Sequence, residues 1–509
     1  MGQTEEAAAV TDELSPDMRD RTASPSLCDL FTRTLARRPD AAALNDPLNK
    51  LRVTGQSPMR LTYREADTAI TALAAQLMNA GLSPGAVVAV QLANTVEYPL
   101  VLLAAWRAGL TVALLPQLWR RVELADALGR INARALISAS RIDIVDHAEI
   151  AMNAAADVFS VRHVFGIGKH LSDGMTPLDP GAVHEMPRLP MVDAGKAAVI
   201  SFDVTVDGLI AVPRSHINLI AGGLAISMES GLPSPARILS SVIPSSFAGL
   251  VSSTVTWLLG GGTLSLHHPF DAQTLDGQLR QEECDTLIAP AQLALRLGEA
   301  GMIDSLPALR HVVGLWRTPE RVESSAEWHG GQANFTDVYL FGEAGLVPRR
   351  RLNGGSPAPL AEGPYGLSSG NQARAAGEIL LTPNGTLALR GASTTPMAYR
   401  PARTDNTPAP DSVDTGYGAR RDESNGMLHV TAPPASLAAI GFYRFRTQDL
   451  ERWAERLGPG TTFTTLPDQL NGHRLAGRAS EAARVREAMV ELGLGPLMTE
   501  AFRERGSAH

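Results

Sequence analysis

The segment Leu61–Leu110 reads LTYREADTAITALAAQLMNAGLSPGAVVAVQLANTVEYPLVLLAAWRAGL and contains two helix–strand units in succession. Thr62 and Glu65 form a capping box, which predicts that a helix begins here and ends at the next glycine. Val87–Leu92 is a continuous apolar run, as expected for a strand that is buried on both faces. After a further helical stretch, Leu110–Leu115 repeats the apolar run. Strands that alternate with helices predict a parallel, doubly wound sheet.

The same alternation continues along the chain and extends the α/β prediction over most of its length. Further buried strands are predicted at 135–138, 197–202, 263–266, 286–289 and 311–315. From about residue 334 the pattern changes to short strands between Gly and Pro turns, such as Gly377–Leu381, which predicts a small β-rich subdomain. The last part carries helical patterns at 449–457 and 480–494 and is predicted to be a small α+β unit.

These patterns divide the chain into predicted segments. They are a disordered lead-in (1–24), a main α/β part (25–418, with its β-rich subdomain at about 334–418), a hinge (419–433) and a C-terminal lid (434–509). Pro433 and Pro434 should stiffen the end of the hinge, because each ring fixes a φ angle. The run TDNTPAPDS at 404–412 is predicted to be a surface loop.

Composition and charge exclude several classes of protein. Of the 509 residues, 44% are hydrophobic and 19% are charged, which is typical of a globular chain with more than one domain. The formal net charge of −8, without a basic stripe, argues against binding to nucleic acid. The chain has two cysteines, Cys28 and Cys284, which are far apart in sequence and show neither the pattern of a disulfide framework nor the spacing of a zinc motif. His267 and His268 occupy adjacent strand positions that point to opposite faces, which disfavours a metal site.

No membrane segment or export signal is predicted. Ile243–Leu266 is uncharged, but it is rich in Ser, Thr and Gly, which favours a buried helix followed by a strand over a membrane span. The N-terminal residues lack the apolar core of a signal peptide. Together with the scarcity of cysteine, this favours a cytoplasmic location.

Several fragments occur in an order that points to a known family. After Leu61–Leu110 these are WLLGGGTLSLHHPFD (257–271), APAQLALRL (289–297), LPALRHVVGLW (306–316), GEILLTPNGTLALRGASTTPMAY (377–399) and GFYRFRTQDLERWAERL (441–457). By these fragments the chain resembles the adenylate-forming superfamily of acyl-CoA synthetases and AMP-dependent ligases, over about residues 25–455. The resemblance implies that ATP with Mg²⁺ activates a carboxylic acid as an acyl-adenylate. The thiol of coenzyme A or of a carrier protein then takes the acyl group.

The resemblance also implies a phosphate-binding loop, which is altered here. In the family this loop is rich in Ser, Thr and Gly and ends in Pro-Lys-Gly, a few residues before Ser-His. Ser215 and His216 are present, but DVTVDGLIAVPR at 203–214 keeps only Thr205 and Gly208 of that character. Its two aspartates would repel phosphate, and an alanine stands near the place of the lysine. An ordinary turn between a strand and a helix is the alternative interpretation.

The other nucleotide motifs of the family are altered as well. Phe341, Gly342 and Glu343 stand where the family has Tyr-Gly-x-Thr-Glu, so Phe341 is a candidate to stack on adenine. Glu343 is the candidate Mg²⁺ ligand if this loop is remodelled, and a structural role for it is equally open. Tyr417 replaces the ribose-binding Asp after Thr-Gly. The candidate nucleotide-binding residues are therefore Gly208, Ser215, Phe341, Gly342, Glu343 and Tyr417.

The cations that the family uses for adenylation are missing. No lysine follows Lys196, so the C-terminal lysine of the family is absent, and the Gly-Arg before the hinge is replaced by Ala432-Pro433-Pro434. The remaining catalytic candidates are Glu343, Arg214 and His216. Arg349–Arg351 and Arg420–Arg421 are candidates to replace the lost cations, since Arg binds phosphate bidentately. A solvated surface is the alternative for both runs.

The acyl site is predicted at strand ends, because ligands of open α/β sheets bind there. Its candidate residues are Phe247, Gly249, Leu250, Gly314 and Leu315, the last two within the strand-end segment Gly314–Arg317, and a filled core is the alternative for this region. Two functions remain open at this point. The first is a weak or divergent ligase that acts on a small carboxylic acid. The second is a catalytically impaired relative that binds an acyl ligand, an acyl thioester or a partner protein.

Overall fold

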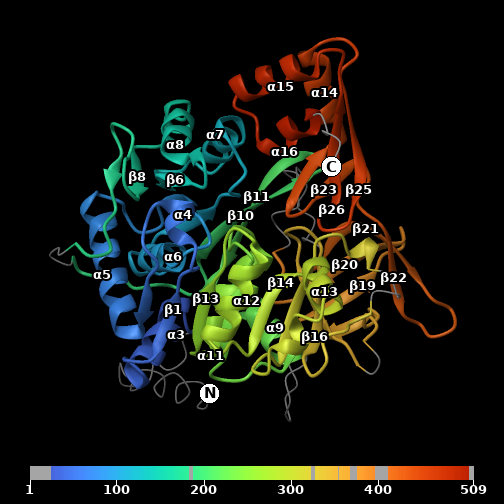
Figure 1. Ribbon diagram of the computed structural model, residues 1–509, viewed down its shortest axis with the longest axis horizontal. Coiled ribbons are helices and arrows are strands. Elements are labelled where there is room, and N and C mark those ends of the chain that lie inside the picture. Colours follow the sequence, from blue (N-terminus) through green and yellow to red (C-terminus); the bar gives the residue numbers. More distant parts are fainter. Residues whose placement is uncertain are drawn as a thin grey trace, which may run out of the picture.

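In the computed structural model, two large sheets pack on either side of a layer of helices (Figure 1). The structure describes residues 24–182, 187–322, 327–352, 355–366, 375–395 and 411–503. The seven-stranded sheet has the order β11-β10-β4-β3-β5-β8-β9. Its strands are β3 (Val87–Gln91), β4 (Thr111–Leu114), β5 (Ala135–Ala139), β8 (His163–Ile167), β9 (Thr176–Pro177), β10 (Ala197–Thr205) and β11 (Gly208–Ser215). All neighbours are parallel except β10 and β11.

The eight-stranded sheet has the order β17-β16-β15-β14-β12-β13-β1-β2. Its strands are β1 (Ala42–Asn45), β2 (Arg60–Thr62), β12 (Arg237–Ser240), β13 (Thr263–Leu266), β14 (Thr286–Pro290), β15 (His311–Trp316), β16 (Asn334–Leu340) and β17 (Leu346–Arg350). The strands from β1 to β16 in this order run parallel, and β2 and β17 are antiparallel edges. This sheet includes residues 334–350, which the sequence assigned to the β-rich subdomain.

Helices connect the strands; several of them contribute to the apolar core that both sheets share, and others pack in separate clusters. They are α3 (Leu27–Arg37), α4 (Lys50–Thr54), α5 (Tyr63–Asn79), α6 (Glu97–Arg107), α7 (Arg121–Arg130), α8 (His147–Ala156), α9 (His216–Ser230), α10 (Phe247–Leu250), α11 (Thr256–Gly260), α12 (Ala272–Gln281) and α13 (Ala291–Glu299). The capping box predicted for α5 is confirmed, since the Thr62 side chain accepts from the Glu65 N–H. The stretch 243–266 forms α10, a π-helical turn, α11 and β13.

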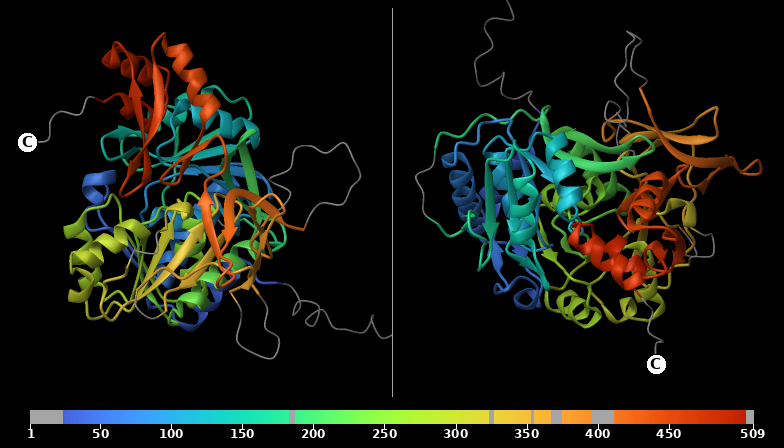
Figure 2. Two further views of the ribbon diagram at one scale, coloured as in Figure 1. Left: turned by 90° about the vertical axis from the view of Figure 1, so that its right-hand side faces the viewer. Right: turned by 90° about the horizontal axis from the view of Figure 1, so that it is seen from above.

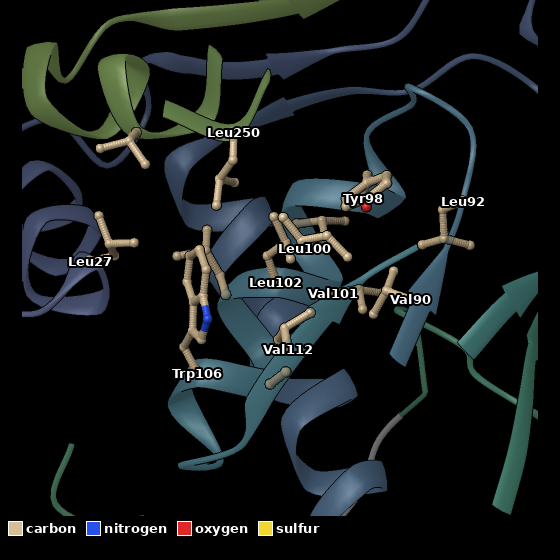
Figure 3. Packing of buried hydrophobic residues seen from close by; sticks show 14 of the residues in the cluster. Leu27, Val90, Leu92, Tyr98, Leu100, Val101, Leu102, Trp106, Val112 and Leu250 are labelled. Carbon is tan, nitrogen blue, oxygen red and sulfur yellow. The ribbon is translucent and has the colours of Figure 1, made fainter. Parts of the chain in front are cut away.

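One large apolar core joins both sheets. It contains Val90 and Val112 of the seven-stranded sheet, Ile238 of the eight-stranded sheet and Trp106 of α6, all buried. Figure 3 shows Trp106 surrounded by leucines of α3, α6 and α10. The Trp106 Nε1–H also donates to the Ala198 carbonyl at 2.9 Å, so its polar group is satisfied inside the core. Apolar burial therefore holds the two layers together.

A five-stranded antiparallel sheet follows the second large sheet. It consists of β18 (Gly363–Tyr365), β19 (Gly377–Leu381), β20 (Thr386–Arg390), β21 (Val413–Arg421) and β22 (Leu428–Ala432). The sequence predicts a hinge at 419–433, but these residues are mostly strand, with Arg420 opposite His429 in the β21–β22 hairpin. Ladder hydrogen bonds fix the backbone here, so a pivot would have to lie after Ala432. The division into a main part and a lid remains a prediction.

The last described residues form a small unit that packs on the seven-stranded sheet. Its elements are β23 (Leu437–Ile440), β24 (Tyr443–Arg446), α14 (Thr447–Leu457), β25 (Thr462–Asp468), β26 (Gly472–Arg478), α15 (Ala482–Glu491) and α16 (Pro496–Thr499). They have their own apolar cluster, which includes Leu450 and Met489. Figure 2 shows this unit beside α7. The Glu123 carboxylate of α7 accepts from the Gly495 N–H at 2.9 Å. The predicted α/β class with a small α+β C-terminal part is confirmed.

Two sequence predictions lie largely outside the described residues, namely the lead-in (1–24, of which residue 24 is described) and the loop at 404–412, of which residues 411 and 412 are described. In the described part, no helix is both long and apolar enough to cross a membrane.

Candidate nucleotide site

Residues 203–214 do not form a loop. They belong to the β10–β11 hairpin, whose register runs from Ala197 opposite Ser215 to Thr205 opposite Gly208. Antiparallel pairing directs alternate N–H groups of each strand toward the other strand, whereas a phosphate loop gathers successive N–H groups around an anion. The simple turn considered for this segment is therefore also wrong. Gly208 has a φ of 112° and makes the tight tip of the hairpin.

Ser215 and His216 have structural partners. Ser215 is the N-cap of α9 and forms a capping box with Asn218. His216 packs edge-on against Trp106 with ring centroids 5.7 Å apart, and its Nδ1 accepts from the Leu27 N–H at 3.4 Å. Burial lowers the pKa of His216 to about 4, so the ring is neutral at neutral pH. Ser215 therefore caps the start of α9, and His216 packs in the apolar core.

Glu343 lies in the turn between β16 and β17 and is held by protein groups. Its carboxylate accepts from the Phe247 N–H at 3.0 Å and lies 3.5 Å from Arg214 Nη1. Arg214 also donates to the Glu343 carbonyl and to Ser201 Oγ, and its guanidinium lies 3.9 Å from the centre of the Phe247 ring. Burial raises the pKa of Glu343, and Arg214 opposes that shift. Release of this carboxylate to a metal would leave Arg214 as a buried cation.

Arg444 of β24 reaches into the space between the three altered motifs. Its Nη1 lies 3.1 Å from Asp203 Oδ2, and its Nη2 donates to the Tyr417 hydroxyl at 2.7 Å. The Glu343 N–H donates to the same Asp203 carboxylate at 2.8 Å. Gly342 has a φ of 59°, and a Cβ there would overlap both Arg444 and Asp203. We call Arg444, Asp203, Gly342 and Tyr417 the Arg444 network.

The ring proposed to stack on adenine is covered. Phe341 is 1% exposed and packs edge-to-face on Tyr417, with centroids 5.3 Å apart. Tyr417 is also 1% exposed, and its hydroxyl is already bonded to Arg444. Neither side chain offers a free surface to a nucleotide in this arrangement.

Arg317 lies directly after β15, at the end of the segment Gly314–Arg317 beside which the acyl site is predicted. Its guanidinium stacks on the Phe442 ring at 3.4 Å, and burial lowers its pKa to about 9. Among the described residues no acceptor is bonded to its Nε. A cavity of about 40 Å³ lies beside it, lined also by Arg444, Ser246 and Glu343.

The residues predicted for the acyl site lie in packed surroundings. Phe247 and Leu250 are buried, and a Cβ at Gly249 would overlap the Ile243 carbonyl. A Cβ at Gly314 would overlap the Phe335 ring, and Leu315 belongs to the large core. The acyl site remains a prediction, and this packing counts against it.

A larger cavity, of about 430 Å³, lies elsewhere, between α7, the β10–β11 hairpin and the C-terminal unit. Its apolar lining includes Trp119, Leu209, Phe445, Leu450, Trp453 and Leu497.

In each of the two arginine runs proposed as replacement cations, one arginine forms an ion pair within the protein. Arg351 forms a buried ion pair with Asp337 at 2.8 Å. Arg421 pairs with Glu362 on the five-stranded sheet. Within the described residues, no group of three or more His, Cys, Asp or Glu side chains is placed to hold a metal ion.

Arg444 is the residue of this site that sequence reasoning missed. It lies in GFYRFR (441–446), a fragment that points to the family only by resemblance. The chain has few lysines, so the signal that could have identified Arg444 is an arginine in a region where the family would use a lysine.

Comparison with known proteins agrees with the fold. Residues 31–357 match the family model described as AMP-binding enzyme. A medium/long-chain-fatty-acid–CoA ligase, FadD6 of Mycobacterium tuberculosis, is 23% identical over 348 residues, which is 64% of this chain and 55% of that protein. The chain thus spans about half the length of this curated relative.

Solved structures share the fold over nearly the whole chain. The amide bond synthetase McbA of Marinactinospora thermotolerans has a TM-score of 0.69 at 20% identity, covering 93% of this chain and 94% of that one. A putative long-chain-fatty-acid CoA ligase of Rhodopseudomonas palustris has a TM-score of 0.62 at 19% identity, covering 80% and 99%. From the match over residues 31–357, the chain belongs to the family of AMP-binding enzymes.

Proposed function

We propose that this protein is an acyl-CoA synthetase-like ligase whose activation of a carboxylic acid by ATP is weak or undetectable. The family supports the ligase class. The observation that carries the low activity is the Arg444 network, in which Arg444 bridges Asp203 and Tyr417 where nucleotide groups would lie. If the protein is active, its cofactors are ATP and Mg²⁺, and coenzyme A or a carrier protein takes the acyl group. A cytoplasmic location remains a prediction.

The residues present do not fit MgATP in this arrangement. A triphosphate would meet Asp203, whose charge Arg444 now balances, and it would find no lysine in the hairpin. A metal ion would need Glu343, which is bonded to the Phe247 N–H and Arg214. Loss of a single preplaced donor typically slows a reaction by about 10²–10³. Several such donors are missing here. Because their losses are not additive, we expect the rate of adenylation to be reduced by a combined factor of at least about 10⁴.

A catalytically impaired binding protein is the second candidate, and the cavity of about 430 Å³ is the place where it would hold its ligand. This cavity has aromatic and aliphatic walls and lies where the C-terminal unit meets the main part. An acyl ligand or an acyl thioester could bury its chain there without any use of ATP.

Exchange of pyrophosphate into ATP, measured with a panel of fatty and aromatic acids, tests the proposal. We expect weak or undetectable acid-dependent exchange and weak MgATP binding by calorimetry. Tyr417→Asp and Ala211→Lys should not restore exchange singly, because the other ligands would still be absent. Robust exchange that collapses in Glu343→Ala would contradict the proposal. Binding of acyl-CoA without ATP would favour the second candidate.

A further inference from the structure

The linker between the five-stranded sheet and the C-terminal unit is short and held in place. It consists of Pro433–Ser436, between the end of β22 and the start of β23. Each of its two proline rings fixes a φ angle. A Cβ built on Gly416 of β21 would lie 3.2 Å from the Pro434 Cβ, so the Pro434 ring rests directly on the main part. Few backbone torsions are therefore left for a swing of the unit.

The segment that leads into α7 is bonded to the C-terminal unit at two places. The Leu118 N–H donates to the Tyr443 hydroxyl at 3.0 Å, and the Glu123 carboxylate accepts from the Gly495 N–H at 2.9 Å. Tyr443 is enclosed between the two parts, and burial raises its pKa to about 12. These bonds connect α7 to both β24 and the region before α16, so they hold the unit at two separated points of its own chain.

Three arginines make further bonds across the interface, each from a different segment. They are Arg446 Nη1 to the Val206 carbonyl (3.1 Å), Arg321 Nη1 to the Gly472 carbonyl (2.6 Å) and Arg296 Nη2 to Gln469 Oε1 (2.8 Å). On the main part these bonds involve the tip of the β10–β11 hairpin, the turn after β15 and α13. Only atoms on the axis of a rotation keep their place, so no rotation of the unit preserves all of these contacts.

The Arg444 network lies among these contacts and is shielded from water. The side chains of Arg444 and Asp203 are 11% and 4% exposed. Phe442 of the unit covers the Arg317 guanidinium at 3.4 Å. Departure of the unit would break the ion pair and would also expose apolar surface such as Phe445, which lines the cavity of about 430 Å³. Charged hydrogen bonds and apolar burial therefore favour the same docked arrangement.

We infer that the C-terminal unit is locked on the main part, with Tyr443 and Arg444 as the latch and Pro434 seated on Gly416 as a fixed joint. The docked arrangement is then the one populated arrangement, and the unit does not act as a moving lid. This inference does not rest on the proposed function. A locked chain can exchange pyrophosphate into ATP, and an inactive chain can have a mobile unit, so the two proposals fail separately.

Distances between spin labels on the full chain test the inference by electron paramagnetic resonance. Ile144→Cys on the main part and Val490→Cys on α15 provide exposed label sites, since Ile144 is 94% and Val490 is 61% exposed. Burial raises the pKa of each native cysteine, Cys28 and Cys284, to about 12, so neither competes for the label. We expect one narrow distance, unchanged by MgATP, coenzyme A or octanoate. A second distance in more than about 10% of molecules under any of these conditions would overturn the inference.

The latch is tested in the same labelled chain by the double variant Tyr443→Phe, Arg444→Met. Loss of the charged bonds of Arg444 should increase the undocked population at least about ten-fold, seen as a second distance. Arg484→Met is the matched control, because Arg484 is exposed and pairs with Glu481 inside the unit, and it should leave the single distance unchanged. A single distance in a folded double variant would overturn the assignment of the latch.

The joint is tested by a second variant, Pro433→Gly with Pro434→Gly, which leaves the latch residues in place. It carries the test of the lock if the double variant fails to fold by circular dichroism. Free φ angles at both positions should add a minor undocked population that the wild type lacks. Distances identical to those of the wild type would overturn the fixed joint.

Discussion

The helix and strand layer from α5 to β4 and the Arg444 network are held together by different forces. The first is local in sequence and is stabilised by buried apolar side chains such as Val90 and Trp106. The second joins Asp203 to Arg444, 241 residues apart, through charges with little contact with water. Apolar burial does not depend on which polar groups stand at the strand ends. A chain of this family can therefore exchange the ligands of its site and keep its fold.

Truncation of the central tryptophan should have the largest effect. Trp106→Ala removes a fully buried ring and the bond to the Ala198 carbonyl, and should lower the free energy of unfolding by about 3–5 kcal/mol. Urea denaturation followed by circular dichroism measures this. Ile144→Ala is the control, because Ile144 is 94% exposed and should change stability by less than about 0.5 kcal/mol. Similar losses in the two variants would mean that the layer is not held by its core.

Removal of one partner of the Arg444 network should cause the second-largest loss in the free energy of unfolding. Arg444→Met leaves Asp203 nearly buried without its cation and should cost about 3 kcal/mol in the same denaturation assay. The double variant Arg444→Met, Asp203→Asn should be less destabilised than the sum of the single variants by about 0.5–3 kcal/mol. Strict additivity would show that the two side chains do not interact in solution.

The pH dependence of the free energy of unfolding should show that His216 is buried in the apolar layer. Burial lowers its pKa from 6.5 to about 4, so below pH 6.5 the unfolded chain binds a proton that the folded chain does not. Stability is therefore lost as the pH falls from 6.5 toward 4, and His216 contributes about 2 kcal/mol of this loss at pH 5. His216→Gln should show a shallower loss over that range in urea denaturation at several pH values. Equal slopes for the two proteins would refute the assignment.

Removal of the helix cap of α5 should cause the smallest loss in the free energy of unfolding. Thr62→Ala removes the side-chain acceptor for the Glu65 N–H and should cost about 1 kcal/mol. Thr62→Ser keeps the acceptor and serves as the matched control in thermal unfolding. A loss in Thr62→Ala as large as that in Trp106→Ala would make local structure as important as burial in this layer.

The fold was predictable where structure follows from neighbouring residues. The capping box at Thr62 and the apolar runs of β3 and β4 determine their elements locally, and the structure confirms them. The hinge prediction failed to anticipate the β21–β22 hairpin, since the Arg420–His429 pairing depends on a sheet partner. The prediction of a loop or a turn at 203–214 is wrong, because the pairing of β10 with β11 leaves little periodic signal in a strand half exposed to solvent.

The sequence by itself determined the α/β class, the family resemblance and the absence of any lysine after Lys196, since these depend only on residue type and spacing. Tertiary structure alone decided what stands in place of the missing groups. Whether Arg444 meets Asp203, or Phe442 covers Arg317, depends on how the C-terminal unit docks on the main part. Such contacts join residues far apart in the chain, and no period of a helix or a strand encodes them.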